Sequence, residues 1–184
     1  MSQVHSIALE ETVKIDRVID HIVGVEEGPT MVFFGGIHGN EPAGVFALKQ
    51  VFDEIRSKNL SVKGEIYAIS GNLGALETHQ RFQQEDLNRI WFHDRIEDII
   101  KKKKIHHNEE NELSQLYLLI QDILENSNPP FYFLDLHTTS SDTTPFMILN
   151  DSLLNRKYGS NYPLPIILGI EEYLKGALLS YINE

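Results

Sequence analysis

The chain has 184 residues, a hydrophobic fraction of 41% and a formal net charge of −11. This length fits one domain with a full hydrophobic core, so we expect residues 1–184 to form a single domain. The acidic charge disfavours nucleic acid or an anionic membrane as the main partner, and no apolar run is long enough to cross a bilayer. Cysteine is absent, which excludes disulfides and thiolate metal ligands. Since the N-terminus also does not resemble a signal peptide, we expect a cytoplasmic protein.

The first half of the chain predicts strands on either side of one long helix. Alternating or continuous apolar residues predict strands over 12–25, 30–34 and 62–70. The helix begins near Pro42, where a missing N–H costs nothing. We expect its buried face to consist of Val45, Leu48, Val51, Phe52 and Ile55. We expect residues 72–92 to be irregular or short-helical.

The second half continues the alternation, which favours a layered α/β fold. Residues 95–126 predict helix around a charged interruption at 101–112, which we interpret as solvated surface, as charge runs usually are. Residues 131–136 predict a buried strand with 146–149 as its neighbour. A further strand is expected over 166–170, followed by an amphipathic helix over 172–182.

A first candidate site lies directly after the strand at 30–34, in the sequence Gly36-Ile37-His38-Gly39-Asn40-Glu41. A histidine and a carboxylate three residues apart can reach one metal, and the glycines allow the sharp turn that brings them together. In open α/β sheets, ligands bind beyond the carboxyl ends of strands. The same His-x-x-Glu spacing recurs at His106/Glu109 and His107/Glu110, which we attribute to charged composition.

A second candidate is His137, at the end of the strand over 131–136. Side chains alternate across a strand, so Asp135 points to the same side as His137. Asp135 either orients the His137 ring, as carboxylates behind metal ligands do, or forms hydrogen bonds at the strand end. Two histidines and one carboxylate leave a fourth position open on zinc, which is the catalytic arrangement.

A third set is Arg81 with Asn88 and Arg89, in the irregular segment. A guanidinium can bind a carboxylate through two hydrogen bonds, and an asparagine adds a donor. Arg81 is a candidate for stabilising a developing oxyanion.

Together these segments resemble the succinylglutamate desuccinylase/aspartoacylase family, which is related to the zinc carboxypeptidases. The matching segments are GGIHGNEPAG (35–44), RFQQEDLNR (81–89) and LDLHTT (134–139). The resemblance implies a three-layer α/β/α fold with a mixed sheet, of the zinc carboxypeptidase-like (phosphorylase/hydrolase-like) type. It also implies one Zn²⁺ per chain and a cytoplasmic deacylase that hydrolyses the amide bond of a small-molecule N-acyl amino acid.

The resemblance further implies a role for each candidate residue. His38, Glu41 and His137 would hold the zinc. Arg81 would be catalytic by polarising the scissile carbonyl, and Asn88 and Arg89 would bind a substrate carboxylate.

The chain departs from the family pattern in its last part. The family's catalytic glutamate lies well after the third ligand, so we expect it beyond residue 184, in a longer protein of which this chain is the N-terminal piece. Gly169-Ile170-Glu171-Glu172 imitates the expected motif but comes too early. Some aspartoacylase-like enzymes also use an arginine near residues 175–182, where this chain has none.

Three alternatives remain. A zinc carboxypeptidase would use the same ligands on peptides, and a metal-binding piece without turnover would lack the base. A nucleotide-binding protein is disfavoured because the glycine-rich turn lacks both the G-x-G-x-x-G spacing and a P-loop lysine. The sequence does not determine the acyl group, the amino acid or the oligomeric state.

Overall fold

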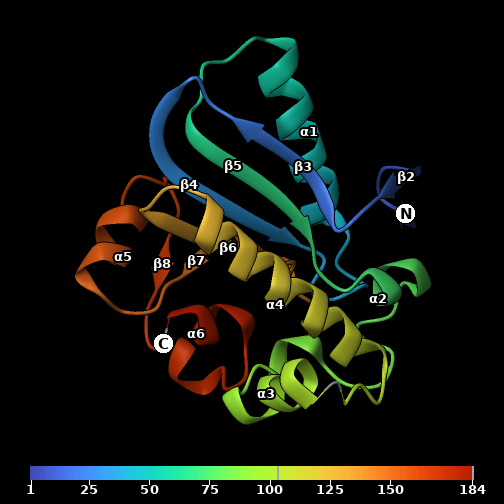
Figure 1. Ribbon diagram of the computed structural model, residues 1–184. Helices are drawn as coiled ribbons and strands as arrows, with labels where there is room; N and C mark the ends of the chain where they lie inside the picture. Colours follow the sequence, from blue (N-terminus) through green and yellow to red (C-terminus); the bar gives the residue numbers. More distant parts are fainter. Residues whose placement is uncertain (103, 184) are drawn as a thin grey trace.

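A four-stranded mixed sheet forms the centre of the fold (Figure 1). The computed structural model describes residues 1–102 and 104–183, with the backbone alone at Glu171. The strand order is β3-β5-β4-β6, in which β4 runs parallel to β5 and β6, and β3 runs antiparallel to β5. The bounds are Val18–Val23 for β3, Glu26–Gly35 for β4, Lys63–Ser70 for β5 and Phe131–Leu136 for β6. These four strands confirm the predicted strand positions, although β4 begins earlier than expected.

Helices cover both faces of this sheet, which confirms the three-layer α/β/α architecture (Figure 1). One face is covered by α1 (Ala43–Ser57). The other is covered by α3 (His93–Lys102), α4 (Asn108–Asn126) and α6 (Leu178–Asn183). Because side chains alternate along a strand, Phe33 of β4 packs on the α1 side while its neighbours Val32 and Phe34 pack on the α4 side.

The larger core lies between the sheet and α4. Four apolar side chains of α4 are buried there at the helical spacing, namely Leu113, Leu116, Ile120 and Ile123. The segment that leads into α3 adds Leu87, Ile90 and Trp91 to the same core, so it is fixed against the sheet by burial.

The remaining elements are short and lie at the ends of the sheet. A hairpin of β1 (Ser2–Ser6) and β2 (Glu11–Ile15) packs against α1 and α2 (Leu73–Thr78). Single 3-10 turns form η1 (Leu87–Arg89) and η2 (Glu171–Tyr173). The last third contains α5 (Leu153–Gly159) and the parallel pair β7 (Met147–Ile148) and β8 (Ile166–Ile167).

Three expectations about this arrangement were wrong. Strand β7 is not the neighbour of β6, because it pairs with β8 instead. The predicted helix over 172–182 begins only at Leu178. The chain before it does not continue the helix, because Gly176 has a φ of +69° and its carbonyl accepts a hydrogen bond from Trp91 N. In α1, Val51 lies at the edge of the apolar stripe and is 51% exposed.

The charged segment over 101–112 was also only partly predicted. Lys101, Lys102 and Lys104 are exposed as expected, and residue 103 lies outside the described residues. The glutamates that follow are buried instead, with 0% exposure at Glu109, 5% at Glu110 and 4% at Glu112. Buried carboxylates need hydrogen-bonding partners, and each of these finds partners in chain segments that are distant in sequence.

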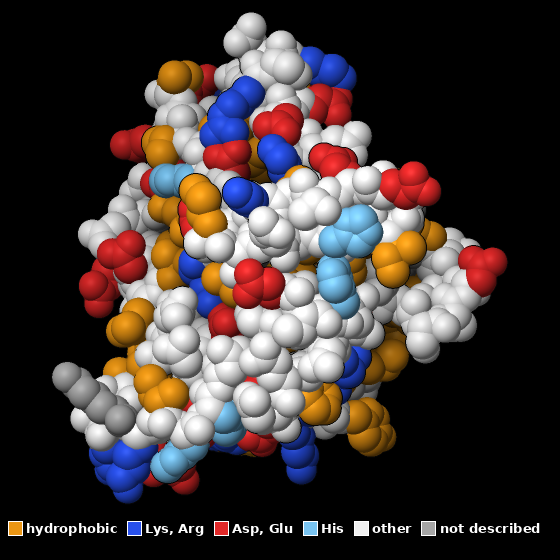
Figure 2. Space-filling view, turned by 90° about the vertical axis from the view of Figure 1, so that its right-hand side faces the viewer, with side chains coloured by type: hydrophobic (Ala, Val, Ile, Leu, Met, Phe, Trp, Pro, Cys, Tyr) orange, Lys and Arg blue, Asp and Glu red, His pale blue; other side chains and the backbone are white. Residues whose placement is uncertain are grey.

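The surface is of mixed charge on the face shown in Figure 2, where acidic and basic side chains are interspersed with apolar ones. Within the described residues, no helix combines the length and the apolar character that a membrane crossing requires.

The burial of α4 gives a direct test of this core. Replacing Leu116, which is fully buried, with alanine should lower the free energy of unfolding by about 2–5 kcal/mol, because the change removes apolar contacts and leaves a cavity. The matched control is Leu118→Ala on the same helix, where the side chain is 54% exposed and the cost should stay within about 0.5 kcal/mol. Urea unfolding followed by circular dichroism measures both. Equal losses in the two variants would contradict the observed packing of α4.

Candidate metal centre

The candidate site lies where β4 and β6 end side by side. These strands are parallel neighbours, and Gly35 at the end of β4 is paired with Leu136 at the end of β6. His38 follows β4 by three residues, and His137 follows β6 directly. The sheet register therefore brings two histidines together that are far apart in the sequence.

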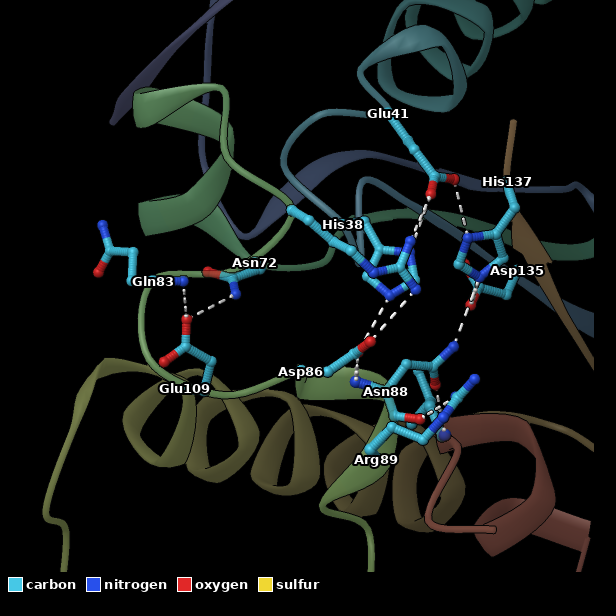
Figure 3. Close-up of polar contacts among 12 residues, drawn as sticks. His38, Glu41, Asn72, Gln83, Asp86, Asn88, Arg89, Glu109, Asp135 and His137 are labelled. Carbon is cyan, nitrogen blue, oxygen red and sulfur yellow. Dashed lines mark hydrogen bonds and ion pairs between the residues drawn. The ribbon is translucent and has the colours of Figure 1, made fainter. Parts of the chain in front are cut away.

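The turn after β4 depends on its glycines, as the sequence predicted. Gly36 has a φ of +74°, a conformation that costs glycine little. Gly39 packs so closely against α2 that an added Cβ would lie 2.0 Å from the carbonyl carbon of Ala75. This path places Glu41 directly before α1, facing the two histidines (Figure 3).

The carboxylate of Glu41 bridges the two imidazoles. Its Oε1 lies 3.0 Å from His38 Nδ1 and its Oε2 lies 3.0 Å from His137 Nδ1. Thr138 N also donates to Oε2, at 2.8 Å. His38 and Glu41 are buried, with 4% and 7% exposure, whereas the His137 side chain is 34% exposed. The structure thus brings together the three residues that were predicted as metal ligands.

Each histidine also contacts a second carboxylate, through the Nε2 atom on the side of the ring away from Glu41. His38 Nε2 lies 3.0 Å from Asp86 Oδ1, and His137 Nε2 lies 2.7 Å from Asp135 Oδ2 (Figure 3). Of the two interpretations of Asp135, the contact supports the one in which it orients the His137 ring. Asp86 was quoted within a motif but given no role. Its only local signature is that it caps η1 by accepting a hydrogen bond from Asn88 N.

The predicted polar residues around the ligands come from the segment that precedes α3. Arg81 Nη1 lies 3.4 Å from Glu41 Oε1, and its Nη2 lies 3.2 Å from Asp86 Oδ2. Asn88 Nδ2 lies 3.5 Å from His137 Nε2, while its Oδ1 accepts a hydrogen bond from Leu178 N. Arg89 lies beside Asn88 and donates to the Asn88 carbonyl (Figure 3). All three residues therefore lie at or beside the cluster.

The cluster shifts the pKa values of its members in opposite directions. Burial lowers the pKa of His137, but hydrogen bonds with Asp135 and Glu41 outweigh it and raise the pKa to about 10. The pKa of His38 is raised by Asp86 and Glu41 against the same effect of burial. Burial raises the pKa values of Glu41 and Asp86, yet their bonds to the histidines bring both well below the ordinary range.

The donor set fits a divalent transition metal. One potential ligand atom from each of His38, Glu41 and His137 lies within 4.8 Å of the others, and in the described part of the chain this is the one group of three or more such residues. Nitrogen and carboxylate ligands suit zinc. Because Nε2 of both histidines is engaged by a carboxylate, Nδ1 is the atom left to face a metal.

The two other His-x-x-Glu copies do not form such a group in the described residues. The structure also gives no support to Glu171 or Glu172 as the catalytic base. Glu172 is exposed within η2, and the Glu171 side chain lies outside the described residues.

Solved structures share this fold. Succinylglutamate desuccinylase from Vibrio cholerae superposes with a TM-score of 0.68 at 20% identity, over 89% of this chain and 49% of that one. The enzyme of the same name from Vibrio parahaemolyticus gives 0.52 at 24% identity, over 67% of this chain and 39% of that one. At these identities the likeness establishes the fold alone.

Two proteins of related name are also similar in sequence to parts of this chain. A succinylglutamate desuccinylase from Photorhabdus laumondii is 39% identical over 76 residues, which are 41% of this chain and 23% of that protein. A probable aspartoacylase from Trichodesmium erythraeum is 28% identical over 120 residues, or 65% of this chain and 38% of that protein. The chain thus matches well under two thirds of the length of either relative.

The family model of the succinylglutamate desuccinylase/aspartoacylase catalytic domain matches residues 27–161. This range contains His38, Glu41, Asp86 and His137 together with the strands that carry them. By this match, and as its three motifs predicted, the chain belongs to the succinylglutamate desuccinylase/aspartoacylase family.

Proposed function

We propose that the chain carries the metal centre of a zinc-dependent deacylase that hydrolyses the amide bond of an N-acyl amino acid. The observation that carries the proposal is the cluster of His38, Glu41 and His137, in which two imidazoles present Nδ1 to one carboxylate. Zinc bound there would supply the Lewis acidity that activates water and an acyl carbonyl for hydrolysis. The carboxylates of Asp86 and Asp135 would keep the two imidazole rings in the orientation that this binding requires.

Arg81 suits the stabilisation of an oxyanion. Its guanidinium lies at the edge of the cluster, and its side chain is 44% exposed, so it can meet a bound substrate without leaving Glu41 and Asp86. A fixed positive group aimed at developing negative charge lowers the barrier because it needs no reorganisation during the reaction.

Asn88 and Arg89 suit the binding of the substrate's carboxylate. The Oδ1 atom of Asn88 is occupied by Leu178 N, so its amide nitrogen is turned towards His137 and the open side of the cluster. The adjacent Arg89 guanidinium can add a charge-assisted bond to the same carboxylate. A substrate held in this way by its own charge is oriented as well as bound.

None of the cluster's carboxylates is assigned as the general base. Glu41, Asp86 and Asp135 each accept a hydrogen bond from a histidine, so their oxygens already serve to bind or orient the ligands. A base must be free to take a proton from water.

The names of the relatives support an acyl amino acid as the substrate class, since they are called succinylglutamate desuccinylase and probable aspartoacylase. A zinc carboxypeptidase would share the ligands and differ in taking peptides. We further propose a cytoplasmic protein with small molecules rather than nucleic acid or membrane as partners, in keeping with its net charge of −11.

Metal content tests the ligand set. After dialysis against zinc and then buffer, the wild-type chain should retain about one zinc per chain by elemental analysis, and His38→Ala should lose it, because two ligands hold zinc far more weakly than three. His106→Ala is the matched control, since His106 belongs to a His-x-x-Glu copy outside the cluster. Retention of zinc by His38→Ala would refute the assigned ligands.

Zinc affinity should rise with pH. With its pKa raised to about 10, His137 holds a proton in the metal-free chain at neutral pH, and zinc binds only neutral imidazole. Each displaced proton weakens binding below its pKa, so affinity should increase at least about tenfold per unit between pH 6 and 8. Chelator competition measures the affinity, and calorimetry in two buffers counts the released protons. An affinity that is constant across this range would contradict the proposed state of the histidines.

Arg89→Ala tests the carboxylate site on the zinc-loaded chain. Binding of N-succinylglutamate or N-acetylaspartate, measured by calorimetry, should weaken about 10- to 100-fold, because a charge-assisted hydrogen bond contributes about 1.5–3 kcal/mol. Arg56→Ala is the control, since Arg56 pairs with Asp20 on α1 and β3, away from the cluster. Tighter binding and faster hydrolysis of dipeptides would favour the carboxypeptidase alternative.

A further inference from the structure

Glu109 is a buried carboxylate that the proposed chemistry does not use. It lies in the first turn of α4 and is 0% exposed. Burying a carboxylate is costly unless hydrogen bonds replace the lost water. Its partners therefore indicate what the side chain does for the protein.

Three amide donors converge on the Glu109 carboxylate. Oε1 accepts from Gln83 N at 2.7 Å and from Asn72 Nδ2 at 3.3 Å, and Oε2 accepts from Gln84 N at 3.3 Å. The Asn72 amide cannot turn over without loss, because its Oδ1 caps α2 by accepting from Ala75 N. Burial alone would raise the pKa of Glu109, but these donors lower it, so the group is a charged acceptor for fixed donors.

The chain that Glu109 holds carries two members of the metal centre. Between α2 and η1, residues 79–86 form neither helix nor strand, and residues 79–82 are exposed. Gln83 and Gln84 lie in this segment between Arg81 and Asp86, the residues that reach Glu41 and His38. A loop without its own hydrogen-bonded ladder takes its conformation from outside contacts.

Other contacts hold the same segment through the main chain and through side chains. Gly39 N donates to Arg81 O and Gln80 N donates to Ala75 O, each at 3.2 Å. Arg95 joins Glu85 to Glu110, but Glu85 is 43% exposed, so solvent competes for this link. Glu109 differs because it is fully buried and binds the main chain itself at two consecutive residues. Figure 3 shows Glu109 beside Gln83 and Asn72, apart from His38 and His137.

We propose that Glu109 is a positioning residue of the metal centre. By fixing the backbone at Gln83 and Gln84, it sets Asp86 against His38 and Arg81 beside Glu41. It touches neither the ligands nor a substrate and acts through Asp86. Its effect on metal binding rests on the proposed function, whereas its effect on the segment does not.

The diagnostic change is Glu109→Gln. Glutamine has nearly the same shape, but its NH₂ group would face an amide N–H in either orientation, so donors would oppose donors. The matched control is Glu112→Gln, one turn further along α4. Glu112 is 4% exposed, and its carboxylate binds Arg17 and Gly74 N rather than the 79–86 segment.

Zinc affinity in a double-mutant cycle tests the route through Asp86. Glu109→Gln and Asp86→Asn should each weaken zinc binding about 10- to 100-fold, as loss of a carboxylate behind a ligand does. The double variant should bind zinc no more weakly than Asp86→Asn alone, because both changes remove the same contact, that of Asp86 with His38. Glu112→Gln should change affinity less than about threefold. Additive losses, or an unchanged affinity in Glu109→Gln, would overturn the proposal.

Amide hydrogen exchange in the metal-free chain tests the positioning itself. The Gln83 and Gln84 amides should exchange at least about tenfold faster in Glu109→Gln than in wild type or Glu112→Gln, while the amides of β4 keep their rates. If Glu109→Gln does not fold, Glu109→Asp, which keeps the charge and withdraws it by one methylene, should show the same local increase.

Unchanged exchange at Gln83 and Gln84 would reject the positioning role. If wild type binds no zinc while Glu109→Gln still shows the local increase in exchange, the proposed function is rejected and Glu109 remains a positioning residue of this segment. The two failures are therefore distinguishable.

Discussion

The arrangement of the site depends on one carboxylate, that of Glu41, shared between two imidazoles. Both histidines turn Nδ1 towards it, while Asp86 and Asp135 hold Nε2 of each ring on the opposite side. The parallel pairing of β4 and β6 sets the separation of the two rings. A one-residue slip in that register would reverse the faces of the strand side chains and remove His137 from the cluster.

The charges of the cluster suit a divalent metal. Three carboxylates face two imidazoles and Arg81, and the raised pKa of each histidine means that the cluster recruits protons to offset its negative charge. A divalent cation that displaces the His137 proton adds positive charge where the carboxylates gather. The carboxylates of the cluster therefore suit a divalent metal as well as a protonated imidazole.

The sequence predicted that His38, Glu41 and His137 lie together, because each stands close to a strand end that an apolar run marks. It did not identify Asp86 or Glu109 as parts of the site. Asp86 lies 48 residues from His38, and nothing local distinguishes a carboxylate that orients a ring from one that caps a turn. Glu109 follows a run of lysines and looked like solvated surface. Its burial arises only when α4 packs against a segment some 25 residues earlier. Local composition reports the average behaviour of charged runs, whereas burial is decided by which distant segment supplies the donors.

The structure thus supports the site in two different ways. The ligands stand at the ends of β4 and β6 or beside α1, so the sheet and its hydrophobic core fix them. Arg81, Asp86, Asn88 and Arg89 stand on a segment with little regular structure, held by Glu109 on one side and by the Leu178 amide on the other. Backbone bonds in a buried sheet resist change more than side-chain anchors do. Substitutions among those anchors can therefore alter the contacts that Arg81 and Asp86 make with the cluster, while the sheet keeps the backbone of the proposed ligands in place.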